Sequence, residues 1–308
     1  MQTADEFLPW LQEQREELHN VEAVAVVSMP QERVRLQSHK FSPHTLLPEN
    51  SDMAIFRRFE WDSEEYSDAF SCLLRCSSER SVLIPFLRQQ IQQLPARSAA
   101  ADWGAGTGDL TQLLHQYCSP TFAIEPAPAM RQMLKQRLPN VQVLTGDLLT
   151  ACPPVVLDYA LLAHVLYHLP DEDWARIILR LLEFQSPDGQ LVIVLKGGKF
   201  GCNLMLERFG AQPFDLMRQI SMHADQFSDF ELQVEQLVAS VNTNSYEQTE
   251  KLARFMMCDR GLDEFSTPPD EAAFANYVAA ELWNPAKQLG GWDYGITVCT
   301  IKKNPTPT

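Results

Sequence analysis

An acidic residue followed by three glycines at alternate positions is the stretch of this sequence best suited to chemistry. Asp102 precedes Gly104, Gly106 and Gly108, and alanines before them give way to an apolar pattern at helical spacing behind them. This order predicts a strand, a tight turn and a helix. Glycine in such a turn permits positive φ and close approach of a ligand, and the helix start offers free N–H groups. The stretch therefore predicts a site for a nucleotide-like ligand.

The glycine spacing distinguishes between two such ligands. A dinucleotide fingerprint places its third glycine three residues after the second, where this chain has Asp109. The stretch instead resembles the Asp-x-Gly-x-Gly-x-Gly motif of class I S-adenosylmethionine-dependent methyltransferases. That resemblance implies S-adenosylmethionine as cofactor. S-adenosylmethionine carries a sulfonium and an ammonium group, so it tolerates nearby acidic residues, whereas an anionic pyrophosphate does not. A glycine-rich turn without a ligand is the alternative.

Two further acids follow predicted strands. Glu125 ends a strand 21 residues after Gly104, where a carboxylate accepts hydrogen bonds from the ribose hydroxyls of an adenosine ligand. Asp147 follows the next strand, at the position where class I methyltransferases contact adenine; the alternative is an aspartate that caps its own loop. Neighbouring residues complete the predicted cofactor site: Pro126, Met130, Leu148, Ala163 and His164.

Alternating strands and helices surround this motif. Apolar strands predicted over 121–125, 141–147, 157–163 and 190–195 are separated by amphipathic patterns, which indicates βαβ units and a parallel sheet. The class I resemblance implies that a strand over 291–301 closes the sheet in the antiparallel direction. We therefore predict a Rossmann-like α/β fold with a seven-stranded, mostly parallel sheet and helices on both faces.

The remaining segments are assigned by position. We predict an N-terminal α+β extension over residues 1–52, to which we assign no role, and a methyltransferase domain over 53–308. Within that domain, helices over about 53–95 and 200–290 are predicted to cover the substrate. The glycines in 196–203 predict a flexible loop.

A closer resemblance, to the histamine N-methyltransferase family, rests on four blocks. These are Tyr66 to Glu79, Asp102 to Gly108, His164 to Pro170, and Leu191 to Gly198. In that family the glutamate matching Glu79 holds the amine of the substrate. The alternative is that Glu79 only occupies the first turn of a helix, where a carboxylate suits the helix dipole.

The chain departs from that family at two positions. The resemblance places His164 where the family has a glutamine that contacts the substrate ring, and Tyr294 where it has an asparagine. We therefore predict methyl transfer to a nitrogen of a small amine or imidazole-bearing molecule related to histamine. Glu79, His164 and Tyr294 are the predicted catalytic residues, and Glu79 is also the predicted substrate anchor.

Aromatic residues are predicted to form a wall that favours a cationic substrate. They are Tyr66, Phe70, Tyr167, Trp292 and Tyr294. The alternatives are that these rings belong to the core and that His164 makes a structural hydrogen bond. Two other functions stay open: an O-methyltransferase that acts on a natural-product hydroxyl with His164 as general base, and a cofactor-binding protein without catalysis.

Composition narrows the class of partner. The formal net charge of −15 disfavours a nucleic-acid substrate, because such a surface repels phosphate. The seven cysteines are scattered and never spaced as Cys-x-x-Cys, so we predict reduced thiols and no metal site. No apolar run approaches the roughly 18 residues of a membrane span, and the first residues lack a signal sequence. We expect a cytoplasmic protein with a small-molecule substrate.

Overall fold

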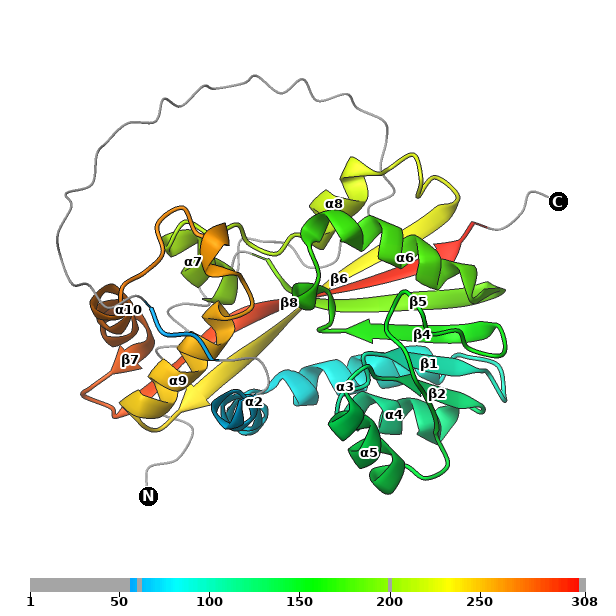
Figure 1. Cartoon of the computed structure of the whole chain (residues 1–308), viewed down its shortest axis with the longest axis horizontal. Helices are drawn as coiled ribbons and strands as arrows, with labels where there is room; N and C mark the ends of the chain where they lie inside the picture. The colour runs from blue at the N-terminus through cyan, green and yellow to red at the C-terminus, as the bar shows by residue number, and fades with distance from the viewer. Residues whose placement is uncertain (1–55, 60–62, 199–200, 305–308) are drawn as a thin grey trace. The chain divides into compact units, whose positions relative to one another are not determined.

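A computed structural model describes residues 56–59, 63–198 and 201–304, and the predicted extension over 1–52 lies outside them. A single sheet forms the centre of the described part (Figure 1). In order across the sheet, its main strands are β3 (Gln142–Leu144), β2 (Thr121–Ile124), β1 (Ala100–Trp103), β4 (Leu157–Ala163), β5 (Gln185–Gly197), β8 (Leu289–Lys303) and β6 (Phe230–Thr243).

Strand direction confirms the predicted fold class. The neighbours from β3 to β5 pair in parallel, whereas β8 runs antiparallel to both β5 and β6. A short strand, β7 (Trp283–Asn284), pairs with β8 beyond the end of β5. Because parallel strands in the middle of such a sheet are covered on both faces, they read as continuous apolar runs. Residues 159–162 and 191–195 are accordingly at most 1% exposed.

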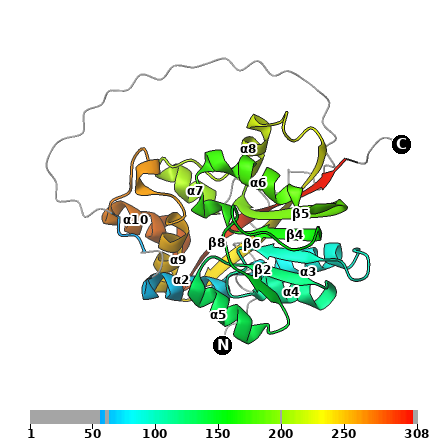
Figure 2. The ribbon, with the colours of Figure 1, turned by 45° about the vertical axis from the view of Figure 1, so that its right-hand side comes forward.

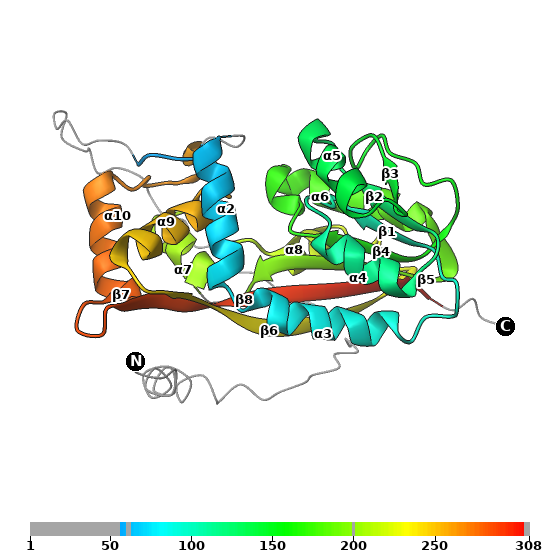
Figure 3. The same cartoon turned by 90° about the horizontal axis from the view of Figure 1, so that it is seen from below.

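Helices cover both faces of the sheet. α3 contacts α4 and β6 on one face, and α6 contacts α8 and β5 on the other, as Figure 3 shows from below. In α6 the apolar residues recur at i, i+3, i+4, i+7 and i+8, which gives the helix one buried side. The bounds of these helices and of α5 are α3 (Glu79–Ile91), α4 (Asp109–Tyr117), α5 (Pro128–Arg137), α6 (Trp174–Glu183) and α8 (Leu216–Met222).

A second group of helices gathers at one end of β6 and β8, as Figures 1 and 2 both show. It consists of α2 (Glu64–Cys76), α7 (Gly201–Arg208), α9 (Tyr246–Met257) and α10 (Glu271–Tyr277), which runs into a π-helical turn (Val278–Leu282). α9 contacts α2, α7 and β8. These helices come from the two segments that the sequence assigned to substrate covering, and that role stays a prediction.

The predicted loop over 196–203 is wrong in two parts. Lys196 and Gly197 belong to β5, and residues from Gly201 onward start α7. Gly197 pairs with Gly295 of β8, and a Cβ on Gly197 would lie 1.9 Å from Oγ1 of Thr297. Glycine at 197 therefore permits close packing of two strands. The prediction treated this glycine as a sign of flexibility and did not anticipate that role.

None of the helices within the described residues combines the length and the apolar character that a bilayer span requires.

Candidate active site

The glycine loop leaves β1 along the end of β2. The backbone N–H groups of Gly104 and Ala105 both donate to the carbonyl of Ile124, at 2.8 and 3.0 Å. Gly104, Gly106 and Gly108 have φ of +82°, +52° and +86°, a region that residues with a Cβ rarely adopt. The alternate glycines therefore let the chain turn sharply from β1 into α4 beside the residue that follows β2.

The three glycines face different surroundings. A Cβ on Gly104 would lie 2.4 Å from Val165, and one on Gly108 would lie 2.5 Å from Leu134. A Cβ on Gly106 would have nothing within 4 Å. Gly104 and Gly108 thus permit close packing, whereas Gly106 faces open space, the side from which a ligand can approach the backbone.

Glu125 lies directly against this loop. Its Oε2 accepts a hydrogen bond from the N–H of Gly106 at 2.9 Å, and its Oε1 accepts one from Ala127 at 2.8 Å. Each carboxylate oxygen keeps a lone pair for a ligand hydroxyl. Because the carboxylate already uses the Gly106 amide and adds negative charge, the loop suits an adenosine with a cationic sulfur better than a pyrophosphate.

Asp102 points toward the start of α4. It is 2% exposed, and its Oδ2 accepts a hydrogen bond from Oγ1 of Thr111 at 2.6 Å. Burial raises the pKa of the Asp102 carboxyl to about 6, and the nearby Glu125 adds to the rise. Asp102 thus ties β1 to α4 beneath the glycine loop, and its predicted contact with the cofactor stays a prediction.

The outer part of the predicted cofactor site is more exposed. Oδ1 of Asp147 accepts bonds from the N–H groups of Leu149 and Thr150 and from the Thr150 hydroxyl, and these hydrogen bonds lower the pKa of Asp147. Asp147 therefore caps its loop, as the alternative interpretation stated, and its predicted adenine contact stays a prediction. Leu148 is buried beside it, while Pro126 is exposed and Met130 half-buried.

The three predicted catalytic residues meet in one hydrogen-bonded network. Glu79, the first residue of α3, accepts a hydrogen bond from Nε2 of His164 at 2.8 Å and one from the hydroxyl of Tyr294 at 2.8 Å. Ser77 Oγ lies 2.6 Å from the Tyr294 hydroxyl and accepts a bond from the Glu79 amide at 3.0 Å. Residues from α3, from the loop after β4 and from β8 thus converge on one carboxylate.

The carboxylate of Glu79 is held in its charged form. Burial opposes this, but the positive charge that His164 carries when it is protonated and the hydrogen bonds from His164 and Tyr294 outweigh it and lower the pKa of Glu79 to about 2. The side chain is nevertheless 22% exposed, so a ligand can reach it. Glu79 also occupies the first turn of α3, as the helix-start alternative states, and its role as substrate anchor stays a prediction.

The network adjoins the glycine loop. His164 follows Ala163, the last residue of β4, and has φ of +57°. The next residue, Val165, is the one that packs against Gly104. On the other side, Arg80 follows Glu79 and pairs with Asp109, the first residue of α4. The candidate acceptor site and the candidate cofactor loop are therefore parts of one site at the carboxyl ends of β1 and β4.

Sequence reasoning missed a buried ion pair beside this network. Lys196 pairs with Asp259, and their side chains are 8% and 9% exposed. The Lys196 amide donates to the hydroxyl of Tyr167, which lies 3.1 Å from Nδ1 of His164. A lysine predicted to sit in a flexible loop gave no signal of burial, and its partner lies 63 residues further along the chain.

The predicted aromatic wall is only partly assembled. Tyr167 and Tyr294 belong to the network, whereas Tyr66 packs on Phe255, with ring centroids 5.0 Å apart. Burial and the charge of Asp259 raise the pKa of Tyr66 to about 12. Two members lie elsewhere: Phe70 is 36% exposed with its ring 6.2 Å from Phe255, and Trp292 packs against Gly201 of α7.

Comparison with known proteins identifies the central part of the chain. Residues 101–193 match the family model described as a methyltransferase domain. An uncharacterized methyltransferase of Oceanobacillus iheyensis is 33% identical over 94 residues, which is 30% of this chain and 43% of that protein. The uncharacterized methyltransferase YrrT of Bacillus subtilis is 36% identical over 74 residues, 23% of this chain and 35% of that protein. The chain thus spans less than half the length of these relatives.

Solved structures share the fold. A putative methyltransferase from Bacillus halodurans superposes with a TM-score of 0.52 at 11% identity, over 72% of this chain and 98% of that one. The YcgJ protein from Bacillus subtilis gives 0.50 at 12% identity, over 72% and 98%. The family match identifies residues 101–193 as a methyltransferase domain, and the solved structures share the fold of the sheet around it. S-adenosylmethionine is the cofactor of such a domain.

Proposed function

We propose that this chain transfers a methyl group from S-adenosylmethionine to a nitrogen of a small amine or imidazole-bearing molecule. The observation that carries the proposal is the Glu79 carboxylate, which is ionised, partly exposed and placed beside the glycine loop. A carboxylate at this position binds a substrate ammonium or imidazole N–H through a charge-assisted hydrogen bond, with a contribution of about 1.5–3 kcal/mol.

The hydrogen bonding of His164 favours nitrogen over a hydroxyl as acceptor. Both ring nitrogens are engaged, Nε2 with Glu79 and Nδ1 with Tyr167. A hydroxyl acceptor needs a base to remove its proton, whereas a deprotonated amine or a neutral imidazole already carries the attacking lone pair. A site whose histidine has no uncommitted nitrogen therefore suits a nitrogen nucleophile.

The residue pattern supports the same substrate class. The resemblance to the histamine N-methyltransferase family places the substrate-holding glutamate at Glu79, and it places His164 and Tyr294 where that family has a glutamine and an asparagine. Here these two side chains donate to the same carboxylate. The proposed substrate is therefore a related cation with a different ring or side chain.

The chain's own groups would orient the two reactants. Gly106, facing open space, and Glu125, with a free lone pair on each oxygen, would hold the adenosine, and Glu79 would hold the acceptor amine. S-adenosylmethionine supplies the electrophilic methyl carbon when bound. Alignment of a free nitrogen lone pair with that carbon, in a site shielded from water, is what these residues contribute to the reaction.

The test begins with a screen of small amines and imidazoles for methyl acceptance from labelled S-adenosylmethionine, followed by Glu79→Gln. We expect KM for the accepted amine to rise about 10- to 100-fold, in line with the loss of one charge-assisted hydrogen bond. The dissociation constant of S-adenosylmethionine, measured by calorimetry, should change less than about twofold, because Glu125 and the glycine loop are untouched.

Glu64→Gln is the matched control, because Glu64 lies in the exposed first turn of α2. It should leave both constants unchanged. An unchanged KM in a folded Glu79→Gln protein contradicts the anchor role. A product methylated on oxygen contradicts the proposed acceptor class and supports the O-methyltransferase alternative.

A further inference from the structure

Two consecutive residues after α9, Asp259 and Arg260, form buried ion pairs with two different elements of the active-site side. Asp259 pairs with Lys196 of β5. Arg260 is 5% exposed and binds the carboxylate of Asp171 with both terminal nitrogens, at 2.9 and 3.0 Å. Removing an ion partner at such depth leaves a charge without compensation, so both pairs constrain the segments that they join.

Asp259 acts on Tyr167 through Lys196. The Lys196 ammonium lies 5.0 Å from the centroid of the Tyr167 ring, and the Lys196 main-chain N–H donates to the Tyr167 hydroxyl. Because Asp259 holds the ammonium, it also keeps the cation over this ring. The Tyr167 oxygen thus accepts from Lys196, which directs the Tyr167 proton toward Nδ1 of His164, 3.1 Å away.

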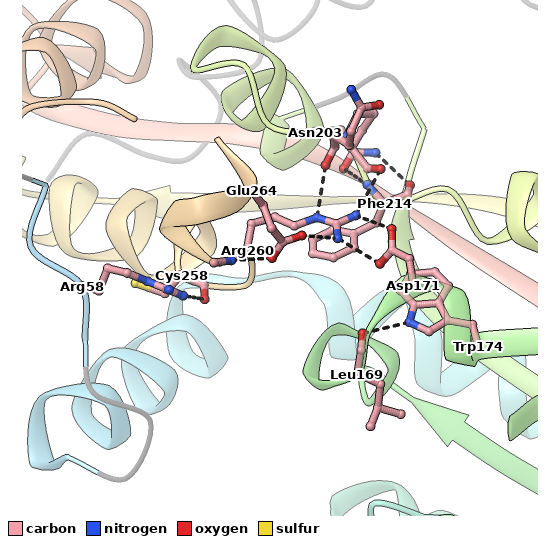
Figure 4. A network of polar contacts seen from close by, with 12 residues as sticks. Arg58, Leu169, Asp171, Trp174, Asn203, Phe214, Cys258, Arg260 and Glu264 are labelled. Carbon is pink, nitrogen blue, oxygen red and sulfur yellow. Dashed lines mark hydrogen bonds and ion pairs between the residues drawn. The ribbon is translucent and has the colours of Figure 1, made fainter. Parts of the chain in front are cut away.

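Arg260 binds the far end of the loop after β4 through Asp171, and Figure 4 shows its guanidinium between Asp171, Phe214 and Glu264. Asp171 lies seven residues after His164, at the start of the short 3-10 helix Asp171–Asp173. The guanidinium lies 4.1 Å from the centroid of Phe214, whose ring centroid is 4.7 Å from that of Tyr167. Arg260 also donates to Glu264 and to the carbonyls of Gln212 and Pro213. One guanidinium therefore fixes both the end of the loop and a ring that supports Tyr167.

The backbone of His164 requires such support. Its φ of +57° is unfavourable for a residue with a Cβ and persists only where the surroundings determine it. With Nδ1 accepting from Tyr167, the neutral imidazole carries its proton on Nε2, which faces Oε1 of Glu79 at 2.8 Å. The orientation of the Tyr167 hydroxyl thus decides which tautomer Glu79 meets.

We propose that Asp259 and Arg260 are positioning residues, which hold Tyr167 and the loop after β4 so that His164 keeps its proton on Nε2 beside Glu79. The importance of this tautomer for methyl transfer rests on the proposed function, whereas the tautomer itself does not. Asp259 and Arg260 lie in a turn of the 200–290 segment, directly after α9. The segment assigned to substrate covering therefore also determines which ring nitrogen of His164 carries the proton.

The test is long-range 1H–15N NMR of the histidine side chains in the full chain, with His164→Gln used to assign the His164 signals. Wild-type protein should show the neutral Nε2-protonated pattern for His164. In Asp259→Asn, Arg260→Lys and Tyr167→Phe we expect signals of both neutral tautomers. A folded Asp259→Asn or Arg260→Lys protein with the wild-type pattern overturns the proposal, and so does a wild-type pattern other than Nε2-protonated.

Arg254→Lys is the matched control. Arg254 lies in α9, is 8% exposed, binds Glu271 with both terminal nitrogens at 2.8 and 2.7 Å, and lies 5.0 Å from the Phe274 ring. It therefore resembles Arg260 in burial and bonding without contacting the loop after β4. Arg254→Lys should retain the wild-type tautomer of His164. Mixed tautomers in this variant would show that any loss of a buried arginine loosens the structure around His164, and this result would overturn the proposal.

Activity gives a second readout once an acceptor is known. Asp259→Asn and Arg260→Lys should lower kcat for the amine about tenfold or more, while the dissociation constant of S-adenosylmethionine stays within about twofold of wild type. If no amine is methylated by the wild-type chain, the proposed function fails, but the tautomer experiment still decides the positioning role. The two failures are thus distinguishable.

Discussion

At the scale of single residues, the candidate site consists largely of carboxylates, and the neighbours of each carboxylate determine its properties. Glu79 is ionised because His164 and Tyr294 donate to it, whereas Asp102 lies against one hydroxyl under a buried turn and has a raised pKa. Glu125 accepts two backbone N–H groups and still faces the loop. Three acids within one site therefore have three different properties, which follow from hydrogen-bond partners and burial.

Glu125→Ala tests the predicted ribose contact. The substitution removes the acceptor for ligand hydroxyls and leaves the Gly106 N–H without its carboxylate, so we expect the affinity for S-adenosylmethionine to fall about 10- to 100-fold by calorimetry. Glu183→Ala, at the exposed end of α6, should bind normally. Retained affinity in Glu125→Ala would show that the adenosine lies elsewhere.

At the scale of elements, the glycines of the loop differ in their surroundings: some pack against protein atoms and one faces open space. Gly108 packs against Leu134 of α5, whereas Gly106 faces open space. The long strand β8 also has two roles, since its first half carries Trp292 and Tyr294 toward the helices at one end and its second half pairs with β5 and β6 inside the sheet. β8 thus connects the middle of the sheet with the helices that are predicted to cover the substrate.

A pair of alanine substitutions separates these roles. Gly108→Ala should lower the free energy of unfolding by about 2 kcal/mol or more, because an unfavourable positive φ adds to a clash with Leu134. Gly106→Ala meets no protein atom and should cost about 1 kcal/mol from φ alone. Gly106→Ala should nevertheless weaken S-adenosylmethionine binding at least tenfold. Denaturant unfolding and calorimetry provide the two measurements, and equal effects of both variants on stability would contradict this division.

At the scale of the whole molecule, the raised pKa of Asp102 makes stability depend on pH. The folded state holds this proton up to about pH 6 and the unfolded chain only to about 3.8, so stability falls as pH rises between these values. Above pH 6 the cost is about 3 kcal/mol. The carboxyl group of Asp102 therefore destabilises the fold above pH 6.

Asp102→Asn should remove that cost. We expect the cofactor-free variant to be more stable than wild type by about 2–3 kcal/mol at pH 7, with the difference vanishing near pH 4, where the wild-type carboxyl is protonated as well. Asparagine still accepts the hydrogen bond from Thr111. Thermal unfolding at several pH values measures the difference, and a constant difference across this range would contradict the raised pKa.

Much of the parallel half of the fold is predictable because its signals are local. The strand predicted over 157–163 coincides with β4, since a short apolar run between polar turns is typical of a buried strand. The break between α2 and α3 follows from Ser77 and Ser78, although the hydroxyl that accepts from the Glu79 amide is that of Ser77. Within the segment over 200–290 that is predicted to be helical, α10 runs into a π-helical turn, which the sequence pattern did not reveal.

The sequence by itself determined the methyltransferase domain, its glycine loop and the acids that follow the strands, because these features lie within short stretches whose spacing reflects backbone geometry. That Glu79, His164 and Tyr294 share one hydrogen-bonded network, and that the Lys196–Asp259 pair lies beside it, follows only from the folded arrangement of the chain. Those contacts join residues 63 to 215 positions apart, and they depend on strand order and burial, which no local pattern encodes.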